Sequence, residues 1–321
     1  MAADWLIRLL GTPDADAKFT VAIWGLSVDQ EVQLAENVRL MPFATLPDSP
    51  LKKRISERAA TLWNDVVWVS QRRFDLPGAA IIWKVANFPY IRTDDASFQA
   101  MAELESAAQE AAIFLQGRIA GQPLAFGYWF EYEDRDLDLN AYENYISWIL
   151  PEVVPMVRAA PPMELDTVRR RFNALSAVQI DWRTDLRRSM ERFISSQCRH
   201  QMIDRILDLT LAFEIAVSGD GNQAPLSWKV AVRSAQMLGG SLQERLEHRG
   251  KLSELYKLRN KGTHGSSLSS VTLQKQQTIL AEASKLYRDL LERLWCQGMR
   301  PNWSAIELEP SLPSPVSKLD E

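Results

Sequence analysis

The sequence predicts an α+β domain in the first half of the chain and an all-α helical bundle in the second. Short runs of β-branched and aromatic residues, which are typical of strands, lie almost entirely in the first half of the 321 residues. From Leu165 onward the apolar residues instead recur with the 3.6-residue period of amphipathic helices. Two patterns in succession indicate two domains, which the length of the chain also favours.

Four strands and two helices are predicted in the first half. One helix begins with Ser49 as its cap, followed by a proline at the first helical position, and extends through Trp63. The other begins at Asp95 or Ser97 and extends through Gln116, over residues rich in Ala, Glu and Met. The predicted strands are residues 19–24, 66–69, 80–85 and 125–130.

Five helices are predicted in the second half. Glycines and polar residues at 219–222 separate the second helix from the third, and Gly239 and Gly240 separate the third from the fourth. Leucines and isoleucine of the last helix keep to one broad face. The predicted helices are residues 165–178, 183–218, 226–239, 242–261 and 271–297.

Prolines mark the predicted domain boundaries. They cluster over residues 151–162, between the strand-rich and the helical parts of the chain. We therefore expect an α+β sensing or regulatory domain over residues 1–155 and a helical bundle over residues 163–298. Residues 299–321 are rich in Pro and Ser and are expected to form a flexible tail.

Positive charge is concentrated in the helical half. Residues 165–265 carry 17 Lys and Arg against 11 Asp and Glu, whereas residues 1–164 carry 14 against 23. Nucleic acid would be attracted to the first of these blocks and repelled by the second. The arginines of the basic block either bind RNA phosphates or form a solvated helix face, and their alternation with acidic residues favours the solvated face. They include Arg169, Arg170, Arg171, Arg183, Arg187, Arg188 and Arg192.

Several classes of function lack their sequence motifs. Cys198 and Cys296 are far apart and do not have the paired spacing of a disulfide framework or a zinc site, so we expect no metal and no cofactor. This use of cysteine fits a cytoplasmic location. No run of 18 apolar residues occurs, so we expect no membrane span. The phosphate-binding loop, the dinucleotide-binding loop and the serine-hydrolase motif are absent too.

The strongest functional signal is a polar run near the end of the fourth predicted helix of the bundle. Arg259 and His264 lie five positions apart, with Asn260 between them and Gly262 as the expected end of the helix. A helix that ends there lets His264 fold back beside Arg259. The arginine would then hold a phosphate, and the histidine would transfer a proton during RNA cleavage. The alternative is a polar helix end, where cations are favoured by the helix dipole.

Three segments of the helical half resemble the ApeA-like branch of the HEPN superfamily. Residues 205–214 are similar to the first core helix of the family, with Phe213 in place of the usual leucine. Residues 226–233 are similar to its next helix. Residues 256–265 are similar to its Arg-x4-His signature, with Asn260 where this branch often has serine.

The resemblance implies a HEPN-like helical bundle, a homodimer and metal-independent RNA cleavage, often in toxins or antiphage-defence effectors. It assigns Arg259, His264 and Asn260 to the catalytic site. The neighbouring residues expected to bind the substrate are Tyr256, Lys257 and Lys261.

A second histidine would complete the acid–base chemistry. A two-fold axis beside His264 would supply it from a second copy of the chain, and we favour this arrangement. His200 of the same chain is the alternative, whereas His248 lies about four turns upstream on the same helix. The alternative function is a non-catalytic HEPN domain that dimerises or binds RNA as an adaptor.

The first half is rich in tryptophan, which we interpret mainly as core. We expect this domain to sense a trigger or to restrain the bundle, through a regulatory ligand or a protein partner.

Overall fold

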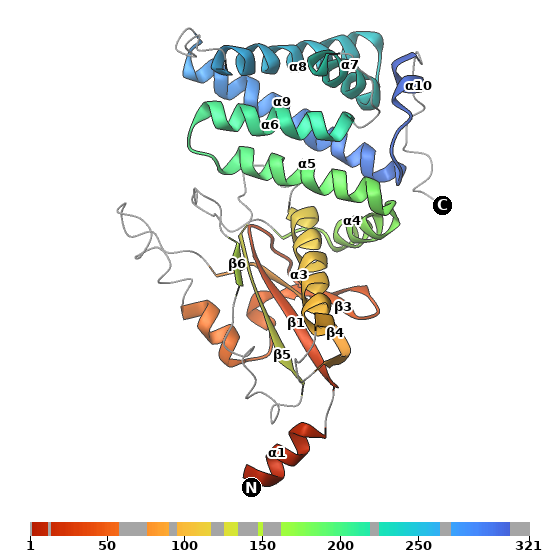
Figure 1. Ribbon diagram of the computed structural model, residues 1–321. Helices are drawn as coiled ribbons and strands as arrows, with labels where there is room; N and C mark the ends of the chain where they lie inside the picture. Colours follow the sequence, from red (N-terminus) through yellow and green to blue (C-terminus); the bar gives the residue numbers. More distant parts are fainter. Residues whose placement is uncertain are drawn as a thin grey trace. The chain divides into compact units, whose positions relative to one another are not determined.

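The computed structural model describes residues 2–11, 14–57, 76–89, 95–116, 125–133, 147–149, 162–218, 225–263 and 271–308. The chain divides into one unit of residues 1–116 and 122–172, and a second of residues 117–121 and 173–321. The first unit is α+β and the second is helical, as the sequence predicted (Figure 1). The proline cluster expected to mark the boundary lies, except for Pro162, outside the described residues.

The first unit is built on a six-stranded antiparallel sheet with β1 near its centre. The strands, in their order across the sheet, are β2 (Val32–Ala35), β3 (Val38–Pro42), β4 (Ala79–Pro89), β1 (Asp14–Trp24), β5 (Ala125–Tyr132) and β6 (Ser147–Ile149). The three predicted strands that became β1, β4 and β5 are confirmed. The predicted strand at residues 66–69 lies outside the described residues, and β2, β3 and β6 were not predicted.

The first unit also contains helices. The helix predicted from Ser49 begins as expected, because Ser49 Oγ accepts a hydrogen bond from the Lys52 backbone N–H at 3.1 Å. Its predicted end at Trp63 lies outside the described residues, which show it over residues 50–57. α3 (Asp95–Gln116) forms where the sequence predicted a helix. It packs against β1 and β4. α1 (Ala2–Leu10) and the short 3₁₀ helix η1 (Phe43–Thr45) were not predicted.

One face of the sheet forms a compact apolar core with residues 43–55. The side chains in it come from β1, β3, β4 and β5 and from the helix after Ser49, and all are buried. They are Ala22, Trp24, Met41, Phe43, Leu46, Leu51, Ile55, Ala80, Ile82 and Trp129. Two of the first-half tryptophans, Trp24 and Trp129, are therefore core residues, as the sequence predicted.

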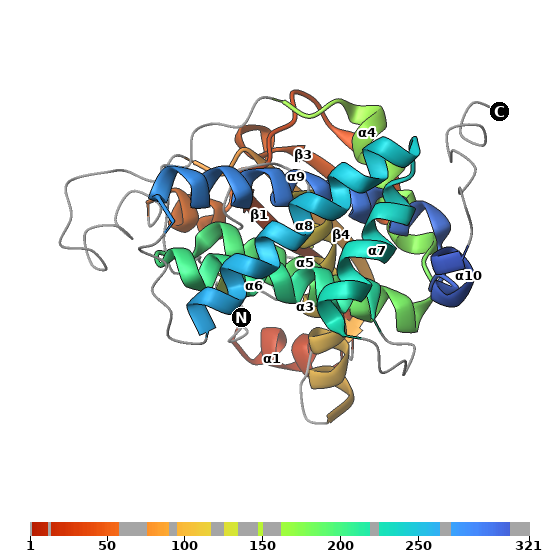
Figure 2. The ribbon, with the colours of Figure 1, turned by 90° about the horizontal axis from the view of Figure 1, so that it is seen from above.

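Helices α5 to α9 pack on one another in the second unit (Figure 2), and α4 precedes them in the chain across the division between the units, which falls after residue 172. The helices are α4 (Leu165–Ala177), α5 (Ile180–Cys198), α6 (Met202–Val217), α7 (Leu226–Leu238), α8 (Leu242–Thr263), α9 (Leu273–Gln297) and α10 (Trp303–Leu308). Phe193 stacks on Tyr287 in the bundle core, and Phe213 meets the same ring edge to face. Ser189 Oγ and Tyr287 Oη lie 2.6 Å apart.

The helical prediction needs two corrections. Residues 183–218 do not form one helix, because the backbone is extended at Arg199 and Gln201 and separates α5 from α6. The flexible tail does not begin at residue 299. Trp303 and Ile306 of α10 are buried, and the Arg233 side chain of α7 pairs with Glu307. Residues 309–321 lie outside the described part of the chain. No helix among the described residues is long and apolar enough to cross a membrane.

Candidate functional site

The predicted catalytic run lies at the C-terminal end of α8. Leu255, Tyr256 and Leu258 are buried and anchor this end of the helix in the bundle. The helix does not end at Gly262 as predicted. It continues to Thr263, whose hydroxyl donates to the Arg259 carbonyl oxygen at 3.0 Å. This hydrogen bond gives a carbonyl of the last turn a side-chain donor.

Arg259 and Asn260 lie together on the last turn. Arg259 Nη1 donates to Asn260 Oδ1 at 3.3 Å. The arginine is half-buried and the asparagine is exposed. A guanidinium held in this way retains further donors that fit the oxygens of a phosphate. The predicted partner His264 is the residue after the helix end and lies outside the described residues.

The three expected substrate-binding residues have different surroundings. Tyr256 is buried, and its hydroxyl donates to Glu214 Oε1 of α6 at 2.9 Å. Burial raises the pKa of Tyr256 well above its usual value, the Glu214 charge adds to this, and Arg259 acts in the opposite direction. Lys257 is exposed and lies 3.6 Å from Glu254, and Lys261 is exposed. Tyr256 therefore supports the helix end, whereas the lysines face solvent.

Two other histidines are described, and they lie on separate elements. His200 is exposed in the break between α5 and α6. His248 is half-buried in α8, and its Nδ1 is buried with no hydrogen-bond partner among the described residues. Burial lowers the pKa of His248, with Lys251 as the next cause. Because His248 lies eleven residues before Arg259 on one helix, about 16 Å along its axis, it is not part of the same site.

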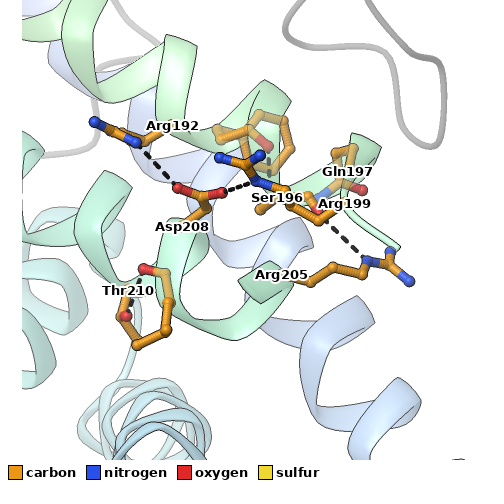
Figure 3. A network of polar contacts seen from close by, with 9 residues as sticks. Arg192, Ser196, Gln197, Arg199, Arg205, Asp208 and Thr210 are labelled. Atoms are coloured by element: carbon orange, nitrogen blue, oxygen red, sulfur yellow. Dashed lines mark hydrogen bonds and ion pairs between the residues drawn. The ribbon is translucent and has the colours of Figure 1, made fainter. Parts of the chain in front are cut away.

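A second polar group was missed by the sequence reasoning. Asp208 of α6 accepts from Arg192 Nη1 at 3.3 Å and from Arg199 Nε at 2.8 Å (Figure 3). Arg205 Nε donates to the Ser196 carbonyl oxygen at 3.0 Å. We call Arg192, Arg199 and Arg205 the arginine cluster. The basic residues were visible in the sequence, but the convergence of Arg192 and Arg199 on Asp208 depends on the α5–α6 break, which has no local signal.

The other basic residues of α5 fit the solvated-face interpretation in part. Arg187 Nε lies 3.0 Å from Glu191 Oε1 on the same helix. This pair joins a basic and an acidic residue on one helix, which is the alternation of charges that the sequence indicated. Arg192 differs, because its partner is a carboxylate on the neighbouring helix.

The first unit contains a cavity of about 160 Å³ over the sheet, beside the start of the helix at residues 50–57. Its wall includes Thr20, Ile82 and Trp129, and charged residues of both signs surround it. Lys18 Nζ pairs with Glu133 at 3.1 Å, so cation and anion balance at one side. Because the cavity is lined by charges of both signs, its charge specifies no ligand class.

No group of His, Cys, Asp and Glu side chains within the described ranges is arranged to hold a metal ion. Comparison with protein-family models, with curated proteins and with solved structures finds no match to this chain.

Proposed function

We propose that the protein is a HEPN-type endoribonuclease that cleaves RNA through Arg259, Asn260 and His264. One observation carries the proposal: the last turn of α8 presents Arg259 and Asn260 in contact with each other at the protein surface, directly before His264. The resemblance of residues 256–265 to the Arg-x4-His signature supplies the reaction class.

The chemistry follows from the residue types. The RNA 2′-hydroxyl attacks the adjacent phosphorus, and the bond from phosphorus to the 5′-oxygen breaks. An imidazole such as that of His264 accepts the hydroxyl proton or protonates the leaving oxygen. The Arg259 guanidinium offsets the negative charge that develops on the phosphate oxygens. The products are a 2′,3′-cyclic phosphate and a 5′-hydroxyl, and no step calls on a metal ion.

The tertiary support for the helix end favours such a role. The Tyr256–Glu214 hydrogen bond ties the last turns of α8 to α6, next to the residue that would hold the phosphate. A catalytic arginine needs this kind of fixed backbone, because small displacements of reacting groups lower the rate strongly. We propose a cytoplasmic homodimer in which each copy supplies one His264, acting as a toxin or antiphage effector under the control of the first unit.

Incubation of the full-length protein with total RNA in EDTA tests the proposal. The wild type should yield fragments that end in a cyclic phosphate, and His264→Ala and Arg259→Ala should each abolish them. Arg249→Ala removes an exposed arginine from the same helix, ten residues before Arg259, and should cleave like the wild type. Light scattering and circular dichroism should show the same dimer and helix content in all four proteins.

A non-catalytic adaptor remains the second candidate. The arginine cluster favours it, because arginines can bind RNA phosphates without cleaving the RNA. Tight binding of RNA that stays intact would support the adaptor. Cleavage by His264→Ala at the wild-type rate would contradict the catalytic assignment.

A further inference from the structure

The arginine cluster combines exposed cations with a buried anion. The Arg192 and Arg199 side chains are 47% and 28% exposed, whereas the Asp208 carboxylate between them is 10% exposed. A ligand that approaches from solvent therefore meets the guanidinium groups before it meets the carboxylate. One buried negative charge faces two positive charges, so the group as a whole is cationic.

Neighbouring residues carry further positive and negative charges. Arg205 adds a third guanidinium from the first turns of α6, and Arg188 is exposed one turn before Arg192 on α5. The acidic residues nearby are Asp204, which is exposed on α6, and Glu191, which pairs with Arg187.

Asp208 also restricts the arginines before any ligand binds. An arginine side chain loses rotamer entropy when it becomes ordered. A hydrogen bond to a carboxylate from a second helix fixes part of that freedom in advance. The planar guanidinium matches phosphate oxygens with two parallel donors, so an oriented arginine favours phosphate over other anions.

The cluster lies at the same end of the bundle as the candidate catalytic residues. In Figures 1 and 2 the end of α5, the start of α6 and the end of α8 all lie where α9 begins. The Tyr256–Glu214 hydrogen bond joins α8 to α6 directly. These helix ends therefore share one end of the bundle.

We propose that Arg192 and Arg199, oriented by Asp208, bind the phosphate backbone of single-stranded RNA next to the cleavage site. The identity of this ligand as the substrate rests on the proposed function. The cluster then binds RNA without reading its sequence, since it contacts phosphates only.

Salt dependence of RNA binding tests the inference. Fluorescence anisotropy is measured with a labelled 20-nucleotide oligouridine between 50 and 300 mM NaCl, on the full-length His264→Ala protein so that the RNA stays intact. Each phosphate contact with single-stranded nucleic acid contributes about 0.7 to the slope of log affinity against log salt. Adding Arg192→Gln and Arg199→Gln should lower that slope by about 1.4.

Two further variants separate RNA binding from a purely structural role. Asp208→Asn removes the charge that orients the two arginines and should bind RNA more weakly than the parent, although the protein gains net positive charge; attraction by net charge alone would predict tighter binding. The matched control, Arg249→Gln with Lys251→Gln, removes two cations from the first half of α8 and should keep the parent slope. Should the double arginine variant fold poorly, adding Asp208→Asn to it removes the unpaired buried carboxylate and keeps the comparison.

The outcomes distinguish this inference from the nuclease proposal. An unchanged slope in the double arginine variant, or a parent that does not bind the RNA, would overturn the inference even if the wild type cleaves. A lowered slope with a wild type that never cleaves would sustain the RNA site and refute the nuclease.

Discussion

Glu307→Gln in α10 should destabilise the helical unit strongly. The Arg233 guanidinium is fully buried, and its Nε donates to Glu307 Oε1 at 2.6 Å. Its Nη1 donates to the Val217 carbonyl oxygen at 2.7 Å, and its Cζ lies 5.4 Å from the centre of the Trp303 ring. Removing the carboxylate charge leaves a buried cation without this counterion, which costs about 3–5 kcal/mol. That cost is a large part of a typical total stability of about 5–15 kcal/mol.

Urea unfolding followed by circular dichroism at 222 nm measures this cost, because the signal comes mainly from helices. The control is Glu282→Gln, the same change in a pair in which Glu282 and Lys251 lie 3.9 Å apart and are both nearly half exposed. An exposed pair of this kind contributes about 0–1 kcal/mol. The two variants should therefore differ by at least about 2 kcal/mol.

A double variant shows whether the stability loss in Glu307→Gln comes from the broken ion pair or from damage to α10. Arg233→Met with Glu307→Leu replaces both charges by apolar side chains of similar length. It should be more stable than Glu307→Gln, because the buried cation is removed together with its carboxylate partner. Equal losses in Glu307→Gln and Glu282→Gln would refute the reasoning and return residues 303–308 to the status of a loosely attached tail.

Two further predictions concern the pH dependence of stability and the room for an added side chain at two glycines. Burial raises the pKa of Tyr256 and Tyr287 above the ordinary value of 10.0, so above about pH 10 the unfolded chain releases these protons first and stability should fall. Thermal melts from pH 8 to 11 should show a shallower fall in Tyr287→Phe, and parallel curves would contradict the assignment. Gly250→Ala should stabilise α8 by about 0.5–1 kcal/mol, because no atom lies within 4 Å of the added Cβ. Gly78→Ala should destabilise the first unit by about 2 kcal/mol or more, because its Cβ would lie 2.3 Å from the Leu26 carbonyl oxygen; urea midpoints that move in the same direction would refute this contrast.

The elements that the sequence predicted are those in which local pattern and packing agree. Residues 19–24 of β1 and residues 79–83 of β4 are buried on both faces and appear as runs rich in β-branched and aromatic residues. The β2–β3 hairpin was missed, although buried Val32 and Leu34 alternate with more exposed residues in β2, and buried Val38 and Leu40 flank the less buried Arg39 in β3. That alternation is the period-2 signal of a half-buried strand, but each strand is too short for it to stand out.

α10 was missed for a different reason. Its sequence adjoins a segment rich in Pro and Ser, and composition therefore favoured a tail. The helix forms because Trp303 and Ile306 are buried and because Glu307 meets an arginine from α7, 74 residues earlier in the chain. Neither fact is visible within the segment itself, so a prediction from local composition could not include it.

The break between α5 and α6 shows why the candidate site was predicted only in part. Residues 199–201 include neither glycine nor proline, and the helical pattern continues across them, so the sequence gives no reason to stop the helix. The break is held by contacts between the helices that it separates. Arg199 turns back to Asp208, and Arg205 caps the Ser196 carbonyl at the end of α5. One long helix would have carried Arg199 away from Asp208 along its axis. The same contacts that hide the break from sequence reasoning therefore create the arginine cluster, whereas Arg259 and Asn260 were found because they are adjacent in the chain.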